Sequence, residues 1–464
     1  MLASATTDPV LKTCIIGAGI SGLAHAWKLK RLGSDCTVLE QAKHSGGAIR
    51  SHRSGDYLAE EGPHSIQLNS PAVENFLKSI PNLQHSIVES KPEAKKRFIV
   101  RNGKLYAVPL NPLAAMTTQL WSLNGKLRAL KEPFIKAAPA DREESIADFV
   151  RRRLGDELYN YAVNPLVAGI YAGNPEALSL KHAFPKLYTL EQDHGSLVRG
   201  MIHKLKSARK NKGHRPNRRI LSFKNGMADL PKALASALGN SLHTAVSIVS
   251  IHKSGNQWQV TYSDTAGKQA EATFDHLILT VPSHQLAELP FEPKLQQALA
   301  NLDSISYPPV SVFTLGFKRS DVRHPLDGFG FLTPERENQQ ILGALFPSSI
   351  FPKRAPGNEV LITAFVGGTR HPEHATDDPE KLKAIVLPEL QQLLGVCGEP
   401  TFQHNKYWEK AIPQYTLGYD KQLANMQQIE QSYPGLMLAG NYRTGISVTA
   451  CIEAAFDQSG LKEW

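Results

Sequence analysis

The hydrophobic pattern of the chain starts with a short apolar run that enters a glycine-rich turn. Residues 14–16 are apolar and lead into Gly17-x-Gly19-x-x-Gly22, after which apolar positions recur with helical spacing over 23–32. A second apolar run, 36–39, ends at the acid Glu40. This order of strand, glycine turn, helix and acid-terminated strand predicts a dinucleotide-binding βαβ unit.

The glycines of this unit have separate physical roles. Gly17 allows a tight turn, Gly19 lets the backbone approach a pyrophosphate, and Gly22 lets the helix pack closely on the strand. The helix N-terminus presents free N–H groups to phosphate, and Glu40 can accept hydrogen bonds from ribose hydroxyls. The following Gly46-Gly47 pair indicates FAD rather than NAD, because the longer cofactor runs its flavin end past a further backbone segment.

Further along, the pattern predicts a β-hairpin and then a helical region. Alternating residues flank Asn102-Gly103, a turn dipeptide typical of tight hairpins. Residues 60–105 are therefore expected to form an extended loop followed by this hairpin. Residues 110–200 have helical patterns, and one of their helices is expected to end at Gly155.

The second half of the chain returns to alternating strands and helices. Strand patterns occur at 245–252, 257–262, 275–282 and 435–440, and helix patterns at 230–238 and 450–456. In 245–252 and 257–262, apolar and polar residues alternate. In contrast, 275–282 and 435–440 are rich in consecutive apolar residues, as expected of strands buried in a parallel sheet. Elements of a dinucleotide-binding domain thus recur at the start, middle and end of the chain, which predicts a second domain threaded through the first.

The predicted fold class is α/β: a Rossmann-type FAD-binding domain, a threaded α+β substrate domain and a helical insertion. The FAD-binding domain is expected to comprise residues 1–85, 220–300 and 405–464. The substrate domain is expected to comprise residues 86–109 and 301–404. The helical insertion is placed at 110–200 and a basic loop at 201–219.

Composition is that of an ordinary globular protein. The 464 residues are 41% hydrophobic and 20% charged, which allows one to three domains. No run of about 18 apolar residues occurs, so no membrane-spanning helix is predicted. Residues 1–11 resemble neither a secretory signal nor a transit segment. The four cysteines, at positions 14, 36, 397 and 451, are expected to be reduced and to bind no metal.

Much of the formal net charge of +9 comes from one segment. Residues 199–219 contain nine Lys or Arg and no acid, and their polar bias predicts a loop or disordered segment. A solvated linker is the simpler interpretation, and contact with anionic lipid headgroups is the alternative. Nucleic-acid binding is not expected, since neither an aromatic platform nor a known binding motif accompanies the charge.

Motifs for hydrolytic or metal-dependent catalysis are missing from the sequence. It contains neither His-Glu-x-x-His nor a Gly-x-Ser-x-Gly elbow. The close pair His371 and His374 is expected in a surface loop, because Pro372 and polar residues surround it. The sequence therefore predicts no metal site, and the redox chemistry is expected to reside in the cofactor.

Five further blocks carry a more specific signal than the glycine motif. They are Gly169-Ile-Tyr-Ala-Gly-Asn-Pro175, Gly328-Phe-Gly-Phe-Leu332, Phe351-Pro-Lys-Arg-Ala-Pro356, Ile412-Pro-Gln-Tyr-Thr-Leu-Gly418 and Ala439-Gly-Asn-Tyr-Arg-Thr-Gly-Ile-Ser-Val448. Together they resemble the flavin-dependent protoporphyrinogen oxidase family, and the likeness extends from about residue 12 to residue 457. The glycine motif alone would also fit amine oxidases and carotene desaturases, but these blocks do not.

The resemblance implies non-covalent FAD and assigns its contacts residue by residue. The pyrophosphate would lie on Gly17, Ala18, Gly19, Ile20, Ser21 and Gly22, and the adenosine on Glu40, Gln41 and Val246. The flavin end would lie on Gly47, Ala48, Gly62, Pro63, His64, Ser65, Trp408, Ile446, Ser447 and Val448. Ala48 departs from the family, in which a larger residue is usual at this position.

The resemblance also implies a porphyrinogen site. Arg97 is expected to pair with a propionate, whose two oxygens match the guanidinium fork. Leu332 and Leu345 are expected to enclose one pyrrole ring and Phe365 to stack on another, with the Gly169 backbone beside the reactive flavin edge. Without the resemblance, Arg97 would be interpreted as a surface residue, Gly169 as part of a turn and the apolar side chains as core.

The implied activity is the six-electron oxidation of protoporphyrinogen IX to protoporphyrin IX in haem biosynthesis, with dioxygen as acceptor and hydrogen peroxide as product. Expected partners are the porphyrinogen, dioxygen, a ferrochelatase that receives the product and an anionic membrane surface. The insertion 110–200 corresponds to the family's membrane-associating region, and its residues 110–120 are too short to cross a bilayer. The expected location is the cytoplasm, including the inner face of the cell membrane, or an organellar membrane in a eukaryote. The sequence is compatible with either a monomer or a homodimer.

Three other interpretations stay open from the sequence. The same fold could act on coproporphyrinogen III, whose four propionates suit a basic protein. Amine oxidation or desaturation would use the same flavin motif, but the aromatic cage of an amine oxidase cannot be assigned. A non-catalytic flavoprotein would be expected to lose the pocket residues, yet Arg97, Leu332, Leu345 and Phe365 are all present.

Overall fold

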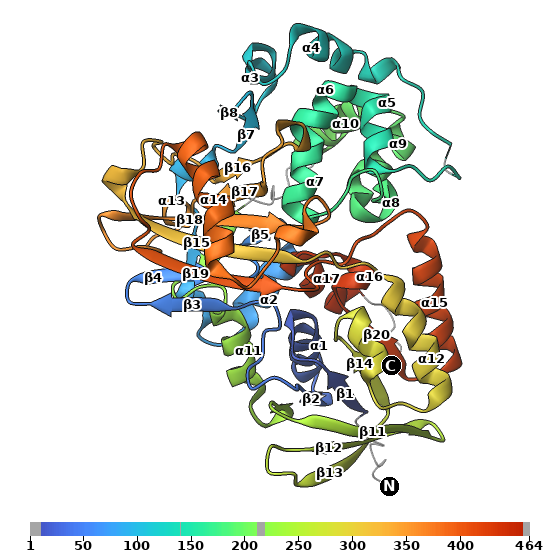
Figure 1. Ribbon diagram of the computed structural model, residues 1–464. Coiled ribbons are helices and arrows are strands. Elements are labelled where there is room, and N and C mark those ends of the chain that lie inside the picture. The colour runs from blue at the N-terminus through green and yellow to red at the C-terminus, as the bar shows by residue number, and fades with distance from the viewer. Residues whose placement is uncertain (1–10, 140, 211–218, 458–464) are drawn as a thin grey trace.

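The domain predicted from the glycine motif is built around a parallel sheet. The computed structural model describes residues 11–139, 141–210 and 219–457. The strand order is β10-β2-β1-β14-β20, and every neighbouring pair is parallel. The strands are β1 (Lys12–Ile16), β2 (Asp35–Leu39), β10 (Leu242–His243), β14 (His276–Leu279) and β20 (Leu436–Leu438). The prediction that the start, middle and end of the chain share one sheet is confirmed (Figure 1).

Both faces of this sheet are covered, because its strands are apolar on both sides. On one face, Ile15 and Val38 share a core with α1 (Ile20–Arg31), α11 (Asp229–Leu238) and α17 (Val448–Asp457). On the other face, Ile16 and Leu279 share a core with α12 (Pro293–Ala300) and α15 (Tyr419–Ser432). An antiparallel sheet of β11 (Ser247–Ser254), β12 (Gln257–Ser263) and β13 (Gln269–Phe274) adds Trp258 to this second core.

Helices α12 and α15 of this domain were not among the predicted elements, and a third helix replaces a segment that was predicted as a loop. Residues 71–79, expected as extended loop, form α2 (Pro71–Ser79). Val73, Phe76 and Leu77 are buried at helical spacing, and Pro71 occupies the first turn, where its missing N–H removes no helical hydrogen bond. Three apolar positions were too few to reveal the helical period in the sequence.

The second domain is centred on a seven-stranded sheet with the order β19-β15-β18-β17-β16-β7-β8. Its strands are β7 (Phe98–Arg101), β8 (Lys104–Ala107), β15 (Val310–Lys318), β16 (Gly330–Leu332), β17 (Ile341–Leu345), β18 (Glu359–Gly367) and β19 (Phe402–Trp408). One face packs on α14 (Pro379–Leu394) through Leu382 and Val386. The hairpin at Asn102-Gly103 is confirmed, and both turn residues have positive φ. Strand β19 crosses the domain boundary expected at residue 405 and belongs wholly to this sheet.

Two small antiparallel sheets lie between the domains. β3 (Ser51–Ser54) and β4 (Tyr57–Glu60) form a hairpin. β5 (Ile66–Leu68) and β6 (Ile87–Glu89) both pair with β9 (Arg219–Phe223). The backbone N–H of Leu58 donates to the Arg354 carbonyl at 3.0 Å, which fixes the β3–β4 hairpin to the substrate domain.

The helical region lies at the top of Figure 1, beyond the substrate sheet. Its main helices are α3 (Pro112–Thr117), α4 (Leu123–Leu130), α5 (Ile146–Leu154), α7 (Asn164–Tyr171), α8 (Leu180–Ala183), α9 (Pro185–His194) and α10 (Leu197–Lys210). The Ser145 hydroxyl caps α5 by accepting from the Asp148 N–H, and Gly155 ends the helix with a φ of +90°, as predicted. Among the described helices, none is both long and apolar enough to cross a bilayer.

The basic segment differs from its prediction. Residues 201–210, expected as part of a loop, continue α10, while residues 211–218 lie outside the described residues. The helix starts where the Glu132 carboxylate accepts from the N–H groups of Leu197 and Val198, and Leu197 is buried. A carboxylate at a helix N-terminus satisfies free N–H groups and complements the helix dipole, which favours a helix over a solvated loop. The distant partner Glu132 could not be identified from the sequence.

Candidate active site

The glycine-rich turn is tightly constrained by the strands around it. Gly17 has a φ of +101°, and its N–H donates to the Leu39 carbonyl at 2.8 Å. The Thr280 hydroxyl, at the end of β14, donates to the Gly17 carbonyl at 2.9 Å. A Cβ atom on Gly22 would lie 2.0 Å from the same carbonyl oxygen, so α1 can start here only with glycine at this position. The role predicted for Gly22 therefore has a direct structural basis.

Three more segments meet at this turn. The Glu40 carboxylate accepts from the Ala18 N–H at 2.7 Å and from the Ala42 N–H at 2.8 Å. The Gly46 N–H donates to the Ala18 carbonyl at 2.8 Å, so the second glycine pair lies against the first motif. The N–H of Val246 donates to the Glu40 carbonyl at 3.1 Å. Residues assigned to pyrophosphate and adenosine from distant parts of the chain are thus neighbours.

These residues fit the adenosine and pyrophosphate half of FAD. A Cβ atom built on Gly19 meets nothing within 4 Å, which leaves the mouth of the turn open. α1 has no side-chain N-cap and no acid in its first turn, so its N–H groups are available to an anion. Gly47, with a φ of +58°, lies against Gly19, since its Cβ atom would be 3.2 Å from the Gly19 Cα. The backbone itself provides the surface for the phosphates.

The flavin end is assigned to a segment that packs directly on the second glycine pair. A Cβ atom on Gly62 would lie 2.0 Å from the Ala48 carbonyl oxygen, so these two segments touch through their backbones. The Trp408 indole N–H donates to the Glu61 carbonyl at 2.7 Å and brings the end of β19 to the same place. Ala48, Gly62 and Trp408 are therefore grouped by the fold.

His64 is a neutral residue at this position. The pKa of His64 is lowered to about 4, mainly by burial and to a smaller extent by the nearby Arg354, although a hydrogen bond to the Gly62 carbonyl opposes the shift. Because a carbonyl only accepts, Nδ1 carries the proton that it donates to Gly62 at 3.0 Å. Nε2 is buried and has no partner among the described residues, so it is a free acceptor beside the proposed flavin site.

The C-terminal segment assigned to the flavin joins the same domain. Ser447 caps α17, since its hydroxyl accepts from the Ala450 N–H at 3.0 Å. Val448 is buried in the core that α17 shares with α1. Ile446 packs on the core of the opposite face of the sheet. Residues 446–448 therefore approach the glycine-rich turn through the α1–α17 contact.

The expected substrate residues share one face of the seven-stranded sheet. Leu332 is paired with Gly343, and Gly343 is paired with Phe365, which places all three in one cross-strand row. Leu345, two residues after Gly343, faces the same side. The ring of His64 makes an edge contact with Phe365 at 5.6 Å between ring centroids, so this face meets the flavin segment.

Gly169 and Arg97 both lie beside this face. A Cβ atom on Gly169 would approach Leu332 Cδ2 to 2.5 Å, so α7 packs its glycine directly on the row. Arg97 precedes β7, in which Ile99 is paired with Leu332, and thus stands two residues along on the same side. Arg97 as a whole is exposed, but its guanidinium lies 4.9 Å from the centroid of the Phe329 ring, and partial burial lowers the pKa of this group. The fold places a cation at the edge of an apolar surface.

The sequence analysis did not predict some residues of the site, and some residues that it did assign make no contact that supports the assignment. Thr280 fixes the glycine turn, and Gly343 lies between Leu332 and Phe365 in the row. Thr280 lies within the predicted strand 275–282 and could have been noticed in the sequence, whereas the register of Gly343 could not. Gln41 is exposed, and the structure gives no side-chain contact that supports its assignment. Pro63 and Ser65 are half-buried beside His64, again without a contact that identifies their role.

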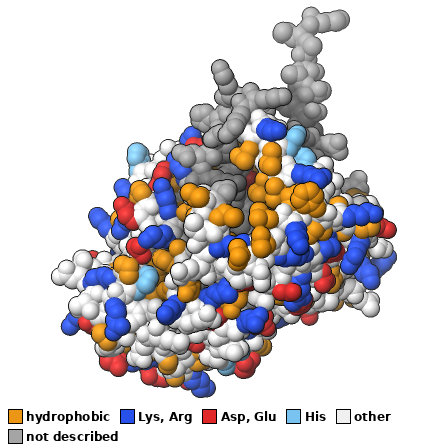
Figure 2. Space-filling view, turned by 90° about the horizontal axis from the view of Figure 1, so that it is seen from above, with side chains coloured by type: hydrophobic (Ala, Val, Ile, Leu, Met, Phe, Trp, Pro, Cys, Tyr) orange, Lys and Arg blue, Asp and Glu red, His pale blue; other side chains and the backbone are white. Residues whose placement is uncertain are grey.

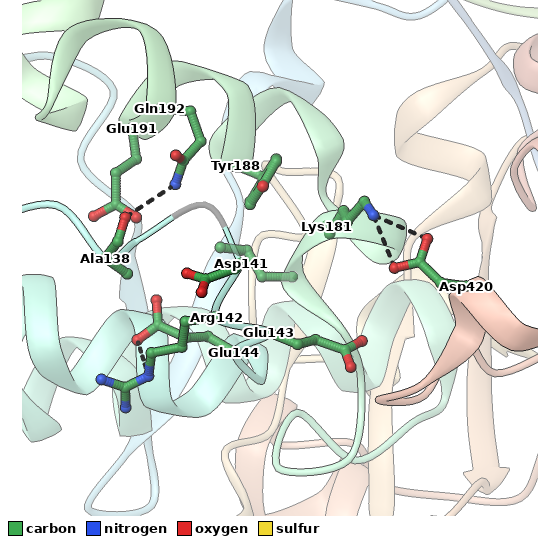
Figure 3. Close-up of a pocket in the computed structure, with 11 residues that line it drawn as sticks. Ala138, Asp141, Arg142, Glu143, Glu144, Lys181, Tyr188, Glu191, Gln192 and Asp420 are labelled. Carbon is green, nitrogen blue, oxygen red and sulfur yellow. Dashed lines mark hydrogen bonds and ion pairs between the residues drawn. The ribbon is translucent and has the colours of Figure 1, made fainter.

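A separate pocket lies in the helical region, away from these residues. It has a volume of about 200 Å³ and is lined mainly by polar side chains of 141–144, α8 and α9, with Asp420 of α15 (Figure 3). Lys181 and Asp420 form an ion pair across it at 2.8 Å. Drug-sized ligands usually occupy roughly 300–1,000 Å³ of mostly apolar space, so this pocket does not suit a tetrapyrrole.

Comparison with known proteins identifies the family and agrees with the fold. The family model described as flavin containing amine oxidoreductase matches residues 20–459. Protoporphyrinogen oxidase 2, chloroplastic/mitochondrial, of Arabidopsis thaliana is 34% identical, over 97% of this chain and 93% of the relative. Coproporphyrinogen III oxidase of Bacillus subtilis is 26% identical, over 95% of both chains.

Solved structures show the same fold. A crystal structure of a protein from Exiguobacterium sp. 255-15 superposes with a TM-score of 0.78 at 23% identity and covers 98% of both chains. Reduced UDP-galactopyranose mutase superposes with a TM-score of 0.70 at 17% identity, over 97% of this chain and 94% of that one. At these identities the structures support the α/β flavin amine oxidase fold and nothing finer.

Proposed function

Because the chain belongs to the protoporphyrinogen/coproporphyrinogen oxidase family within the flavin-containing amine oxidoreductases, we propose that it oxidises protoporphyrinogen IX to protoporphyrin IX with dioxygen as acceptor. As a member of this family, the protein is an FAD-dependent oxidase of haem biosynthesis that acts on a porphyrinogen. The choice between the two porphyrinogens is the proposed part. Higher identity to the Arabidopsis relative than to the Bacillus relative, 34% against 26%, supports the first.

The row on the substrate sheet is the observation that carries this choice. Leu332, Leu345 and Phe365 give an apolar surface, and Arg97 adds a cation at one edge. The next arginine near this face, Arg370, donates to the Thr333 carbonyl at 2.9 Å and to Asn164 at 3.3 Å, so its guanidinium is already engaged. An apolar surface with Arg97 at its edge suits a ring with vinyl groups and two propionates better than one with four propionates.

In this proposal the protein orients the porphyrinogen and keeps the reacting edge dry. Bound FAD supplies the capacity to accept a hydride and pass its electrons to dioxygen. Arg97 pairs with a propionate, the apolar row holds the rings, and the Gly169 backbone lies where α7 meets Leu332. Neutral His64 offers an acceptor at Nε2 between the cofactor segment and Phe365.

A direct comparison of substrates tests the proposal. The purified protein should show flavin absorbance, and porphyrin fluorescence under air should grow with a higher kcat/KM on protoporphyrinogen IX than on coproporphyrinogen III. The reverse order would assign coproporphyrinogen III as substrate. Absence of bound FAD, or no porphyrin formation from either substrate, would rule out the oxidase function.

Replacing Arg97 by alanine is expected to raise KM for the porphyrinogen by roughly tenfold and to change kcat little. A hydrogen bond to a charged group contributes about 1.5–3 kcal/mol, and the exposure of Arg97 favours the lower end. Steady-state kinetics of Arg97→Ala measure the change. Lys95→Ala, an exposed basic neighbour whose carbonyl is retained, is the matched control and should behave as wild type. Equal KM values for wild type, Arg97→Ala and Lys95→Ala would show that Arg97 does not bind the substrate.

We also propose that the helical region binds the surface of an anionic membrane. Figure 2 shows hydrophobic side chains gathered among Lys and Arg on the face that carries this region. Exposed apolar residues of the region are Leu110, Leu113 and Met116 around α3, Leu123, Leu127 and Leu130 on α4, Phe134, and Met201, Ile202 and Leu205 on α10. Phe134 is 84% and Leu113 is 76% exposed. α4 and α10 both contact the turn 132–134, and the Lys126 ammonium of α4 donates to the Met116 carbonyl of α3, so these segments are neighbours.

This surface has the composition of an interfacial membrane site. Isolated exposed apolar residues are ordinary, but a contiguous apolar area bordered by cations is typical of membrane or partner binding. Lys131, Lys136, Lys204 and Lys206 are exposed on the same segments. The segment 110–120, which could equally have packed inside the protein, exposes Leu110 and Leu113 and buries only Leu120 among its leucines.

The double variant Leu113→Ser, Phe134→Ser is expected to lose about thirtyfold in partitioning onto anionic vesicles, since it removes on the order of 2 kcal/mol of apolar burial. Vesicle sedimentation at several lipid concentrations measures it, with neutral vesicles to isolate the contribution of the lysines. Leu417→Ser, at a leucine 45% exposed outside this surface, is the control. An unchanged partition for the double variant would contradict the proposal.

A further inference from the structure

We infer that His52, Glu61 and His404 form a binding site for a divalent transition-metal ion of the zinc type. Each offers one ligand atom, and the three atoms lie within 4.8 Å of one another. His404 Nε2 is 3.0 Å from Glu61 Oε1, and the imidazoles of His52 and His404 are stacked with centroids 3.9 Å apart. Positions 52, 61 and 404 are too far apart for sequence spacing to have indicated a site, and the proposal departs from the expectation of no metal.

The three ligands stand on rigid strands. His52 is on β3, and the Glu61 N–H donates to the Arg50 carbonyl at 3.0 Å, which continues the β3–β4 ladder by one pair. His52 and Glu61 therefore face the same side of the hairpin. His404 is on β19, held by its pairing with Thr314 of β15. Ligands fixed on strands need little ordering on binding, which favours a preformed site.

The geometry is close to what a bound ion requires. Zinc–nitrogen and zinc–oxygen distances of about 2.0–2.2 Å place the ligand atoms of a tetrahedral ion roughly 3.3 Å apart. Binding of one ion by both imidazoles requires the two stacked rings to rotate so that a nitrogen of each faces the ion. The side chains of His404 and Glu61 are 19% and 16% exposed, so the site is sheltered yet open to a water as fourth ligand.

The chemistry of the ligands selects the class of ion. Two imidazoles and one carboxylate suit Zn²⁺, Ni²⁺ or Cu²⁺, whereas Mg²⁺ and Ca²⁺ prefer oxygen ligands alone. Lys406 and Arg50 are near enough to lower the pKa of Glu61, although its hydrogen bond with His404 is the larger cause. The positive charges of Lys406 and Arg50 weaken the attraction of the site for any divalent cation. This further disfavours Mg²⁺ and Ca²⁺, whose binding depends mainly on charge.

The site joins the two domains beside the assigned flavin segment. Figure 1 shows the β3–β4 hairpin next to β19 of the substrate sheet. The Glu61 carbonyl also accepts from the Trp408 indole, so a metal on the Glu61 carboxylate would fix the start of 62–65 and the end of β19 together. Binding is therefore expected to raise the unfolding temperature of the whole protein.

A second group of possible ligands serves as an internal control. His371, Glu373 and His374 also bring their ligand atoms within 4.8 Å. They belong to one short turn, and Glu373 is 63% exposed. No ligand from another part of the described chain completes this group, so the case for a metal there is weaker.

Calorimetric titration of the tag-free FAD-containing protein, after treatment with EDTA, tests the inference. Zn²⁺ should bind saturably at one site per chain and raise the melting temperature, whereas Mg²⁺ should do neither. His52→Ala and His404→Ala should each weaken Zn²⁺ binding by more than the roughly 10–100-fold that loss of an outer-shell partner causes. His371→Ala should bind as wild type. No saturable Zn²⁺ binding, equal binding of Mg²⁺, or loss of binding only in His371→Ala would overturn the inference.

A spectroscopic arm covers the case in which an alanine variant fails to fold. Cu²⁺ bound to the wild-type protein should give an electron paramagnetic resonance spectrum with coupling to two imidazole nitrogens. The near-isosteric Glu61→Gln variant should retain both nitrogens with weaker binding. A spectrum with no imidazole coupling would likewise overturn the inference.

Discussion

Replacing Gly22 by alanine is expected to abolish FAD retention and to destabilise the whole FAD-binding domain. The added Cβ atom would lie 2.0 Å from the Gly17 carbonyl oxygen and 2.7 Å from the Thr280 hydroxyl. The carbonyl belongs to backbone fixed between β1 and β14, so the start of α1 would have to move. Overpacking of this kind costs about 1–3 kcal/mol or more. The purified variant should lack flavin absorbance and melt well below wild type.

Two other glycines separate loss of fold from loss of cofactor. A Cβ atom on Gly19 meets nothing within 4 Å in the protein itself, so Gly19→Ala should keep the wild-type circular dichroism yet bind FAD much more weakly. Gly357 is equally open and lies outside the site, so Gly357→Ala should retain both fold and flavin. If Gly19→Ala retained FAD as wild type does, the pyrophosphate would not lie on this turn.

Local patterns predicted the glycine-rich turn, the hairpin at Asn102-Gly103 and the capped helix ending at Gly155, because their signals lie within a few residues. For the parallel sheet, the sequence predicted which segments form strands, since continuous apolar runs identify buried strands. The α2 helix was missed because it shows only one buried turn of apolar residues.

The site could be predicted only where a family pattern supplied it. Leu332, Gly343 and Phe365 lie on three different strands, and their common row depends on sheet register, which single-strand patterns do not determine. His404 and Glu61 are 343 residues apart, so their contact follows from the threading of one domain through another. Physical reasoning from the sequence reached the cofactor class, and the arrangement of the substrate face came from tertiary structure.

The helical region that carries Gly169 depends on a buried charge cluster. Arg153 is fully buried and donates to Glu191 and, at 3.0 Å, to Glu132, whose side chains are also buried. It also donates to the Gly195 carbonyl at 2.8 Å. Glu132 in turn accepts from the N–H groups that begin α10. One guanidinium thus links α5, the turn 132–134, α9 and α10.

Replacing Arg153 by leucine is therefore expected to lower the free energy of unfolding by about 3–5 kcal/mol, because removing one partner leaves a buried charge uncompensated. Glu191 still forms an ion pair with Arg152 in this variant, so Glu132 is the carboxylate that mainly loses its compensating positive charge. Urea denaturation monitored by circular dichroism measures the change. Arg151→Leu, which breaks an exposed pair with Glu176, is the control and should cost less than about 1 kcal/mol.

The effect of Arg153→Leu should also depend on pH in a defined direction. Burial raises the pKa of Glu132, but the Ser196 hydroxyl, two backbone N–H groups and Arg153 outweigh it and hold the pKa below its usual value. A carboxylate with a lowered folded-state pKa stabilises the protein above its unfolded pKa, and this contribution is lost as pH falls. The difference between wild type and Arg153→Leu should therefore narrow on acidification, and Glu132→Gln in the Arg153→Leu background should restore part of the stability. A pH-independent difference, or equal losses for Arg151→Leu and Arg153→Leu, would mean that packing and not charge holds this region together.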